Sequence, residues 1–158
     1  ERLLAVNLKK EYSLDLPQQK IWEAIQDPDV LASILPNCKS LEPIGPDEFT
    51  ANIEVKLGPI KSNFKSTLSI IDKNPPNGYS FLVSGIGTKG YLNGKGSIHL
   101  LENSDGTSLH FTAEGNVAGI IARVGQRLIE ATGKKLMDQG FENFKQKLFS
   151  LENKQLVS

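Results

Sequence analysis

The sequence is poor in the residues that redox and metal chemistry use. It contains one cysteine, Cys38, and two histidines, His99 and His110. A single cysteine cannot form an internal disulfide, which excludes a disulfide-stapled secreted scaffold. A metal site would need further ligands beside the two histidines. We therefore expect no metal centre, and we interpret Cys38 as a small buried hydrophobic side chain.

Charge of one sign and long apolar runs are also missing. Lysine and arginine number 18 and aspartate and glutamate number 18, so the formal net charge is zero. A nucleic-acid-binding protein would need a basic excess, so we expect no nucleic-acid partner. No stretch reaches the ~20 apolar residues of a transmembrane helix, and the first residues show no signal-peptide pattern. These absences predict a cytoplasmic protein, and they leave room for a local basic patch at a membrane-facing edge.

The length of 158 residues corresponds to one ordinary domain. We found no repeat, no low-complexity tract and no linker in the sequence. We therefore expect a single domain over residues 1–150 and a frayed tail over residues 151–158.

The first part of the sequence predicts a strand followed by two short helices. Alternating side chains from Leu8 to Leu16 share one face of a strand. Pro17 suits a first helical position, and a helix is expected over Gln18–Gln26. Asp27 and the proline after it predict the start of a second helix, which ends at Ile34.

Several alternating segments separated by turn sequences follow, which predicts an antiparallel meander. The sheet is expected to have about seven strands in all. The alternating segments lie between these pairs of residues: Phe49 and Leu57, Ile60 and Ile70, Tyr79 and Val83, Leu92 and Leu100, and Thr107 and Val117.

A helical period replaces the alternation from about Ala118 to Phe149. One apolar stripe contains Val117, Ile121, Val124 and Leu128. A second stripe begins at Met137 and sits roughly half a turn away from the first, at ~100° per residue. Either this helix kinks near Thr132 and Gly133, or different parts of the protein cover its two halves.

The order of elements predicts an α+β, helix-grip fold, in which a curved antiparallel sheet wraps a long C-terminal helix. A bent sheet contacts such a helix along part of its length and leaves a concave apolar space that suits a small molecule. Core and cavity lining have the same apolar signature, and inward serines and glycines favour a cavity. The candidate cavity residues are Leu31, Leu35, Phe64, Leu68, Phe81, Val83, Leu92, Ile98, Phe111, Ile121, Val124 and Leu128.

One motif formally matches a dinucleotide-binding loop, namely Gly85-Ile86-Gly87-Thr88-Lys89-Gly90. That loop works when a helix follows its last glycine, and here an alternating strand follows. We interpret the glycines as residues that let two strands bend. The two histidines are out of phase with their apolar neighbours, so we place both on the solvated face of the sheet and expect no catalytic residue.

An ordered set of motifs resembles the CoxG family of carbon monoxide dehydrogenase. The set spans about Leu8 to Phe149 and has Pro-Asn-Cys where the family usually has Pro-Gly-Cys. Its members are Trp22 with Asp27-Pro28, Leu31, Leu35-Pro36-Asn37-Cys38 with Leu41, Leu57-Gly58-Pro59-Ile60-Lys61 with Phe64, Gly85-Ile86-Gly87 to Gly96, Gly106-Thr107, and Gly119 with Ala122-Arg123-Val124-Gly125-Gln126-Arg127-Leu128-Ile129.

The resemblance implies a helix-grip fold of the class that includes START lipid-transfer domains, birch-pollen-allergen-like proteins and polyketide cyclases. It also implies an accessory role beside a molybdenum hydroxylase of the carbon monoxide dehydrogenase type. Members are thought to bring that enzyme to the inner face of the membrane or to handle a lipid-like or quinone-like molecule for it. The expected ligand is therefore a bound quinone or lipid, with no other cofactor.

Two alternatives remain at this stage. One is a cyclase-like enzyme that folds a substrate in the same cavity. It would need polar or titratable groups facing inward, and the attractive ones are Tyr12, Tyr79, Tyr91 and Ser66. The other is a protein-interaction module whose cavity has no role.

Overall fold

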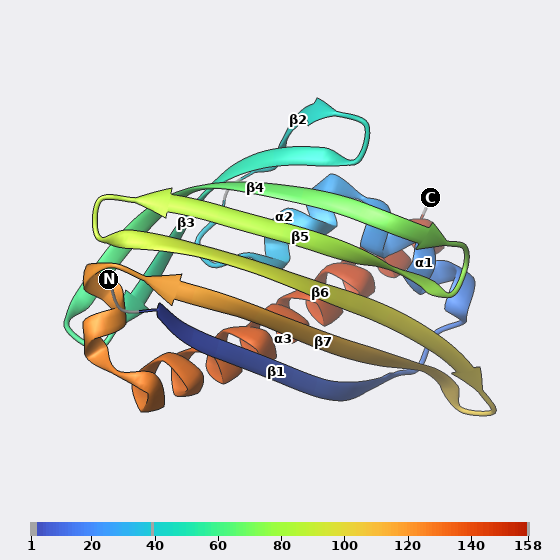
Figure 1. Ribbon diagram of the computed structural model, residues 1–158. Helices are drawn as coiled ribbons and strands as arrows, with labels where there is room; N and C mark the ends of the chain where they lie inside the picture. The colour runs from blue at the N-terminus through green and yellow to red at the C-terminus, as the bar shows by residue number, and fades with distance from the viewer. Residues whose placement is uncertain (1–2, 39, 158) are drawn as a thin grey trace.

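A curved seven-stranded antiparallel sheet dominates the protein, as predicted. The computed structural model describes residues 3–38 and 40–157. The strands follow the order β1-β7-β6-β5-β4-β3-β2, and all three α-helices lie on one side of the sheet (Figure 1). The elements are β1 Leu3–Leu14, α1 Gln18–Gln26, α2 Pro28–Ile34, β2 Glu42–Gly45, β3 Glu48–Leu57, β4 Ile60–Asn74, β5 Gly78–Gly87, β6 Gly90–Asn103, β7 Gly106–Ala118, the 3₁₀ helix η1 Ile120–Val124, and α3 Gln126–Val157.

The two short helices form where the sequence predicts them. The side chain of Asp27 accepts a hydrogen bond from the backbone N–H of Asp29 at 2.9 Å and so caps α2. After α2 the chain turns through Asn37, whose φ of 51° is a left-handed conformation that asparagine tolerates. This turn replaces the glycine-containing turn that is usual in the family.

Glycines in the middle strands let the sheet curve tightly. Gly94 on β6 lies opposite Gly115 on β7. A Cβ atom on Gly115 would lie 2.4 Å from the backbone oxygen of Asn93, and one on Gly96 would lie 2.3 Å from the Phe81 ring. Larger residues at these positions would force the strands apart, so the close approach requires glycine.

The long helix begins later than the sequence indicates. The pattern predicts helix over residues 118–149, whereas η1 precedes α3 as a separate short element. Gly119 and Gly125 flank η1 with φ values of 92° and 99°, which an α-helix does not contain. The apolar period continues across this junction, and this continuity is why the prediction placed the helix start too early.

Two further differences concern the ends of this region. Val117, which the sequence places on the helical stripe, lies in β7 and pairs with Leu4 and Leu92. At the other end α3 continues to Val157, so residues 151–157 of the expected tail are helical. Ser158 lies outside the described residues.

Different parts of the protein cover the two halves of α3, which explains its two apolar stripes. The helix is uninterrupted from Gln126 to Val157. The first half contributes Ile129 to a small cluster at one end of the sheet, which we call the η1 cluster: Leu4, Leu57, Phe64, Ile121, Ala122 and Ile129. The second half contributes Phe144 and Leu148 to the larger core beneath α1 and α2, which we call the main core and which also contains Ile21, Trp22, Ile25, Val30, Leu100 and Leu109.

A polar clasp fixes α3 to the edge strand β1 between these clusters. Asp138 accepts hydrogen bonds from Lys10 Nζ at 2.8 Å and from the Tyr12 hydroxyl at 2.9 Å. The ring of Tyr12 stacks on Phe141 with 3.8 Å between centroids. The hydrogen bonds from Lys10 and then Tyr12 hold the pKa of Asp138 below its usual range.

We expect Asp138→Asn to lower the thermal unfolding midpoint at pH 7. Because the folded-state pKa of Asp138 is lowered, its stabilisation is present above the unfolded pKa of ~3.9 and is lost as pH falls through the folded pKa. The difference from the parent protein should therefore shrink in acid, as measured by calorimetry across pH. Asp105→Asn, in the β6–β7 turn, is the matched control. An Asp138→Asn protein with the parent's pH profile would contradict this role.

Candidate functional site

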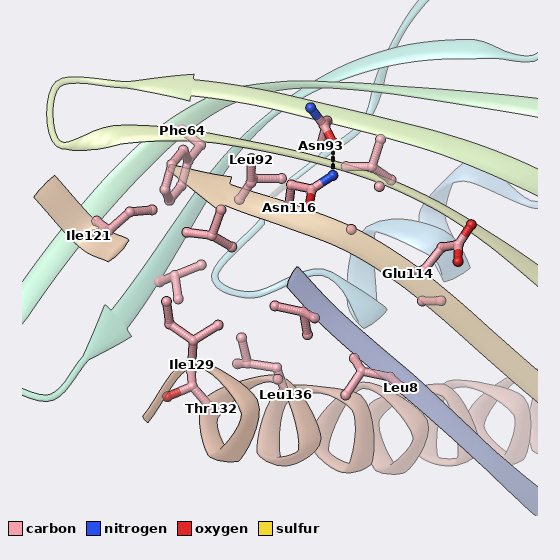
Figure 2. A pocket seen from close by; sticks show the side chains of 18 of the residues that line it. Leu8, Phe64, Leu92, Asn93, Glu114, Asn116, Ile121, Ile129, Thr132 and Leu136 are labelled. Atoms are coloured by element: carbon pink, nitrogen blue, oxygen red, sulfur yellow. Dashed lines mark hydrogen bonds between the residues drawn. The ribbon is translucent and has the colours of Figure 1, made fainter. Parts of the chain in front are cut away.

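An apolar hollow of about 270 Å³ lies between the concave face of the sheet and α3. Figure 2 shows Leu8 of β1, Ile129 and Leu136 of α3, and Leu92 of β6 around this space. The inward-facing side chains of the wall, including those in Figure 2, are Val6, Leu8, Val55, Leu57, Phe64, Phe81, Val83, Leu92, Ala113, Val117, Ile121, Ile129, Thr132 and Leu136. Apart from the hydroxyl of Thr132, this wall is hydrocarbon.

The hollow exists because the two clusters fill the ends of the sheet and leave its middle uncovered. Val83, Leu8 and Leu136 belong to neither cluster. Gly94 and Gly115 in the central strands contribute backbone and no side chain to the wall. The sheet curvature therefore produces a space that the helix does not fill.

Polar residues along the wall belong to the opposite face of the sheet. Asn93, Lys95 and Glu114 line the hollow, but their side chains point away from it because alternate residues of a strand face opposite sides. Asn116 donates a hydrogen bond from Nδ2 to Asn93 Oδ1 at 3.5 Å, drawn in Figure 2. The contribution of these residues to the hollow is backbone.

The predicted cavity residues fall into three groups. The first group lines the hollow: Phe64, Phe81, Val83, Leu92 and Ile121. The second lines a groove on the outer side of α3: Leu35 and Leu128. The third packs within the main core or the η1 cluster: Leu31, Leu68, Ile98, Phe111 and Val124.

Sequence reasoning missed the wall that β1 and α3 provide. Leu8 was recognised as inward-facing on its strand, but nothing in the sequence places it opposite Gly133, whose Cβ position lies 3.4 Å from Leu8 Cδ2. Ile129 and Leu136 are seven residues apart, which puts them on one helix face. That spacing was the available signal.

Two buried hydroxyl groups flank Phe64 on β4. Ser62 and Ser66 are nearly fully buried, and neither Oγ has a hydrogen-bond partner among the described residues. Ser66 Oγ lies 3.0 Å from the Cβ position of Gly85, beside Phe64 and Leu92. Both serines therefore lie in the apolar layer around the hollow without lining it.

The inward groups that a cyclase-like enzyme would need lie elsewhere. Tyr12 bonds to the half-exposed Asp138 in the clasp, and Tyr79 donates a hydrogen bond to the backbone oxygen of Ile25 at 2.6 Å. Burial raises the pKa of both phenols. Tyr91 is exposed on the outer face of the sheet. None of these tyrosines lines the hollow.

The remaining candidate motifs have structural roles. Gly87 and Gly90 close the β5–β6 hairpin, so the dinucleotide-like sequence is a strand turn, as interpreted. His99 pairs with His110 in register on the outer face. Cys38 is half-buried against the main core, and burial raises the pKa of its thiol. Over residues 3–38 and 40–157 there is no cluster of three potential metal ligands.

No helix in the described part of the chain is long and apolar enough to cross a membrane.

Solved structures with the same fold cover nearly the whole chain. A conserved protein from Geobacillus kaustophilus is 30% identical, with a TM-score of 0.82 over 91% of this chain and 94% of that chain. Ara h 8.0201 is 14% identical, with a TM-score of 0.64 over 92% of this chain and 99% of that chain. The Zhui aromatase/cyclase from Streptomyces sp. R1128 is 11% identical, with a TM-score of 0.59 over 93% and 94%. The last two similarities show the helix-grip fold and nothing about activity.

A search of curated proteins finds no match. Residues 11–149 match the family described as the CoxG subunit of carbon monoxide dehydrogenase. This range begins in β1, ends in α3 and contains every side chain of the hollow except Val6 and Leu8. The motifs that carry the resemblance in the sequence thus sit on the observed fold, and the chain belongs to the CoxG family of carbon monoxide dehydrogenase.

Proposed function

We propose that this protein binds a lipid-like or quinone-like molecule in the hollow and carries it without transforming it. The hydrocarbon wall around the hollow is the observation that supports this function. Transfer of apolar ligand surface from water into such a wall is favourable by about 25 cal/mol per Å². A polar ligand would lose its hydrogen bonds to water there and gain few in return.

The size of the hollow limits what it encloses. Its volume of about 270 Å³ lies just below the ~300–1,000 Å³ of typical small-molecule pockets. It therefore suits one ring system or a short alkyl chain, with the polar end of the ligand outside. An amphiphile meets both conditions.

The non-catalytic part of the proposal is supported by where the titratable groups lie. Acid–base catalysis needs a donor or acceptor within hydrogen-bond reach of the substrate. In the described part of the chain no carboxylate, histidine, cysteine or tyrosine side chain faces the hollow. Backbone and hydrocarbon can orient a substrate, but they do not move protons.

Family membership supports an accessory role beside a carbon monoxide dehydrogenase-type molybdenum hydroxylase. In this role the protein supplies the enzyme with its apolar ligand or holds the enzyme at a membrane.

One end of the sheet supports peripheral contact with anionic lipid. Ile86, next to the β5–β6 turn, is 73% exposed and lies opposite Tyr91 in register. Lys65 pairs with Ile86 on the neighbouring strand, and Lys89 lies in the turn itself. Apolar tips surrounded by cations suit an anionic bilayer, where each lysine near the surface contributes about 1 kcal/mol. The net charge of zero thus conceals a local basic patch.

Ligand content tests the leading proposal. We expect organic extraction of the protein purified from cells to release an apolar molecule, and native mass spectrometry to show the corresponding added mass. Val83→Phe should reduce this content because the larger side chain occupies the hollow, whereas Leu82→Phe, whose side chain is on the outer face, should not. The thermal midpoint of each variant checks that it folds. Consistently empty protein, with no thermal shift on adding quinones or fatty acids, would reject the proposal.

Direct binding tests the accessory role. We expect a purified carbon monoxide dehydrogenase-type molybdenum hydroxylase from the same source to form a complex with this chain in analytical ultracentrifugation. A flavoprotein that lacks molybdenum is the control. Absence of a complex with both ligand-loaded and extracted protein would contradict the accessory role and leave ligand binding intact.

Vesicle flotation tests the membrane contact. We expect the protein to float with vesicles containing phosphatidylglycerol more than with pure phosphatidylcholine, and high salt to reduce the difference. Ile86→Glu should weaken flotation, because it places a carboxylate at the lipid contact. Leu101→Glu, at a 49% exposed position near the opposite end of the sheet, is the matched control. Equal losses in the two variants would assign the effect to general surface charge.

A further inference from the structure

A second, open groove of about 600 Å³ lies on the outer side of α3. It runs between the turn after α2, the edge of β3 and the middle of the long helix. Its lining residues are Ile34, Leu35, Pro36, Asn37, Glu54, Lys56, Gly58, Leu128, Ala131, Thr132, Lys135, Leu136, Gln139, Gly140 and Asn143.

The groove exists because this part of β3 is a free strand edge. β2 pairs with β3 only between Glu48 and Thr50, so the rest of β3 has no strand beyond it. The turn after α2 covers one point of that edge, where the backbone N–H of Glu54 donates to Pro36 O at 3.2 Å. The remaining edge faces α3 across the groove.

The groove and the hollow share part of their walls. Thr132 and Leu136 of α3 line both spaces. On β3 the side chains alternate, so Val55 lines the hollow and Lys56 lines the groove. The two spaces are therefore neighbours across α3 and the β3 edge, with Thr132 and Leu136 between them.

The chemistry of the groove complements that of the hollow. Lys56 and Lys135 are exposed, and neither forms an ion pair with a described residue. The acid in the groove, Glu54, is engaged by Lys61 with 3.4 Å between Oε1 and Nζ. The amides of Gln139 and Asn143 add further hydrogen-bond donors. The groove thus presents cations and donors to a bound group.

From this arrangement we infer that the groove is the head-group subsite for an amphiphile whose apolar chain occupies the hollow. The inference rests on the proposed function and specifies the ligand class, which is a single-chain amphiphile with an anionic, oxygen-rich head. The chain passes between Thr132 and Leu136, and the head lies between Lys56 and Lys135. A neutral carbonyl head accepts the same hydrogen bonds but lacks the attraction between opposite charges.

Three probes with the same ten-carbon chain test the head group: decanoate, decanol and decyltrimethylammonium. Calorimetric titration of extracted protein, below micelle-forming concentrations, gives each affinity. We expect decanoate to bind most tightly, decanol less tightly and the cation most weakly. The double variant Lys56→Gln/Lys135→Gln should lose ~10-fold in decanoate affinity, about 1.4 kcal/mol, and keep its decanol affinity. Lys65→Gln/Lys95→Gln, on the outer face of the sheet, is the control.

The outcomes separate this inference from the function on which it rests. If all three probes bind equally, or if both double variants lose decanoate affinity alike, the chain-binding hollow stands and the head-group subsite is rejected. If no probe binds and extraction of the cell-derived protein releases no ligand, the proposed function fails and the inference fails with it. Native mass spectrometry of the decanoate complex should show one ligand per chain, and several would indicate non-specific adsorption and also reject the subsite.

Discussion

The long helix meets the sheet at its two ends and not at its middle, and the rest of the molecule follows from this constraint. At one end Ile129 packs with Phe64 and Ile121 in the η1 cluster. At the other end Phe144 and Leu148 pack beneath the two short helices in the main core. Each half of the helix has a partner, so the hollow between them does not cost the fold its core.

The empty middle is a feature of the sequence as well as of the geometry. Close-packed interiors are the rule, and an unfilled space of this kind destabilises a protein in proportion to its volume. Small residues at Gly94, Ala113 and Gly115 maintain the space where larger side chains would reduce it. Bound apolar matter would restore the lost contacts, which gives the hollow a physical reason to be occupied.

The parts of the fold with strong local signals were predictable, and the parts set by three-dimensional packing were not. The alternation and turn residues predicted the sheet, and Asp27 with its following proline predicted the second helix. The start of α3 was misplaced because the apolar period runs through Gly119 and Gly125, where the backbone leaves helical geometry. Among the candidate cavity residues, Phe64 and Leu31 carry the same apolar signature, and only packing distinguishes a wall of the hollow from the core.

Xenon binding tests the central claim most directly, because xenon enters apolar cavities without needing a polar contact. Crystals of extracted protein under xenon pressure should show one strong anomalous peak between Leu8, Leu92 and Ile129, and Val83→Phe should weaken it. A parent protein with no xenon peak there, and with side chains filling the space between α3 and the sheet, would contradict the account.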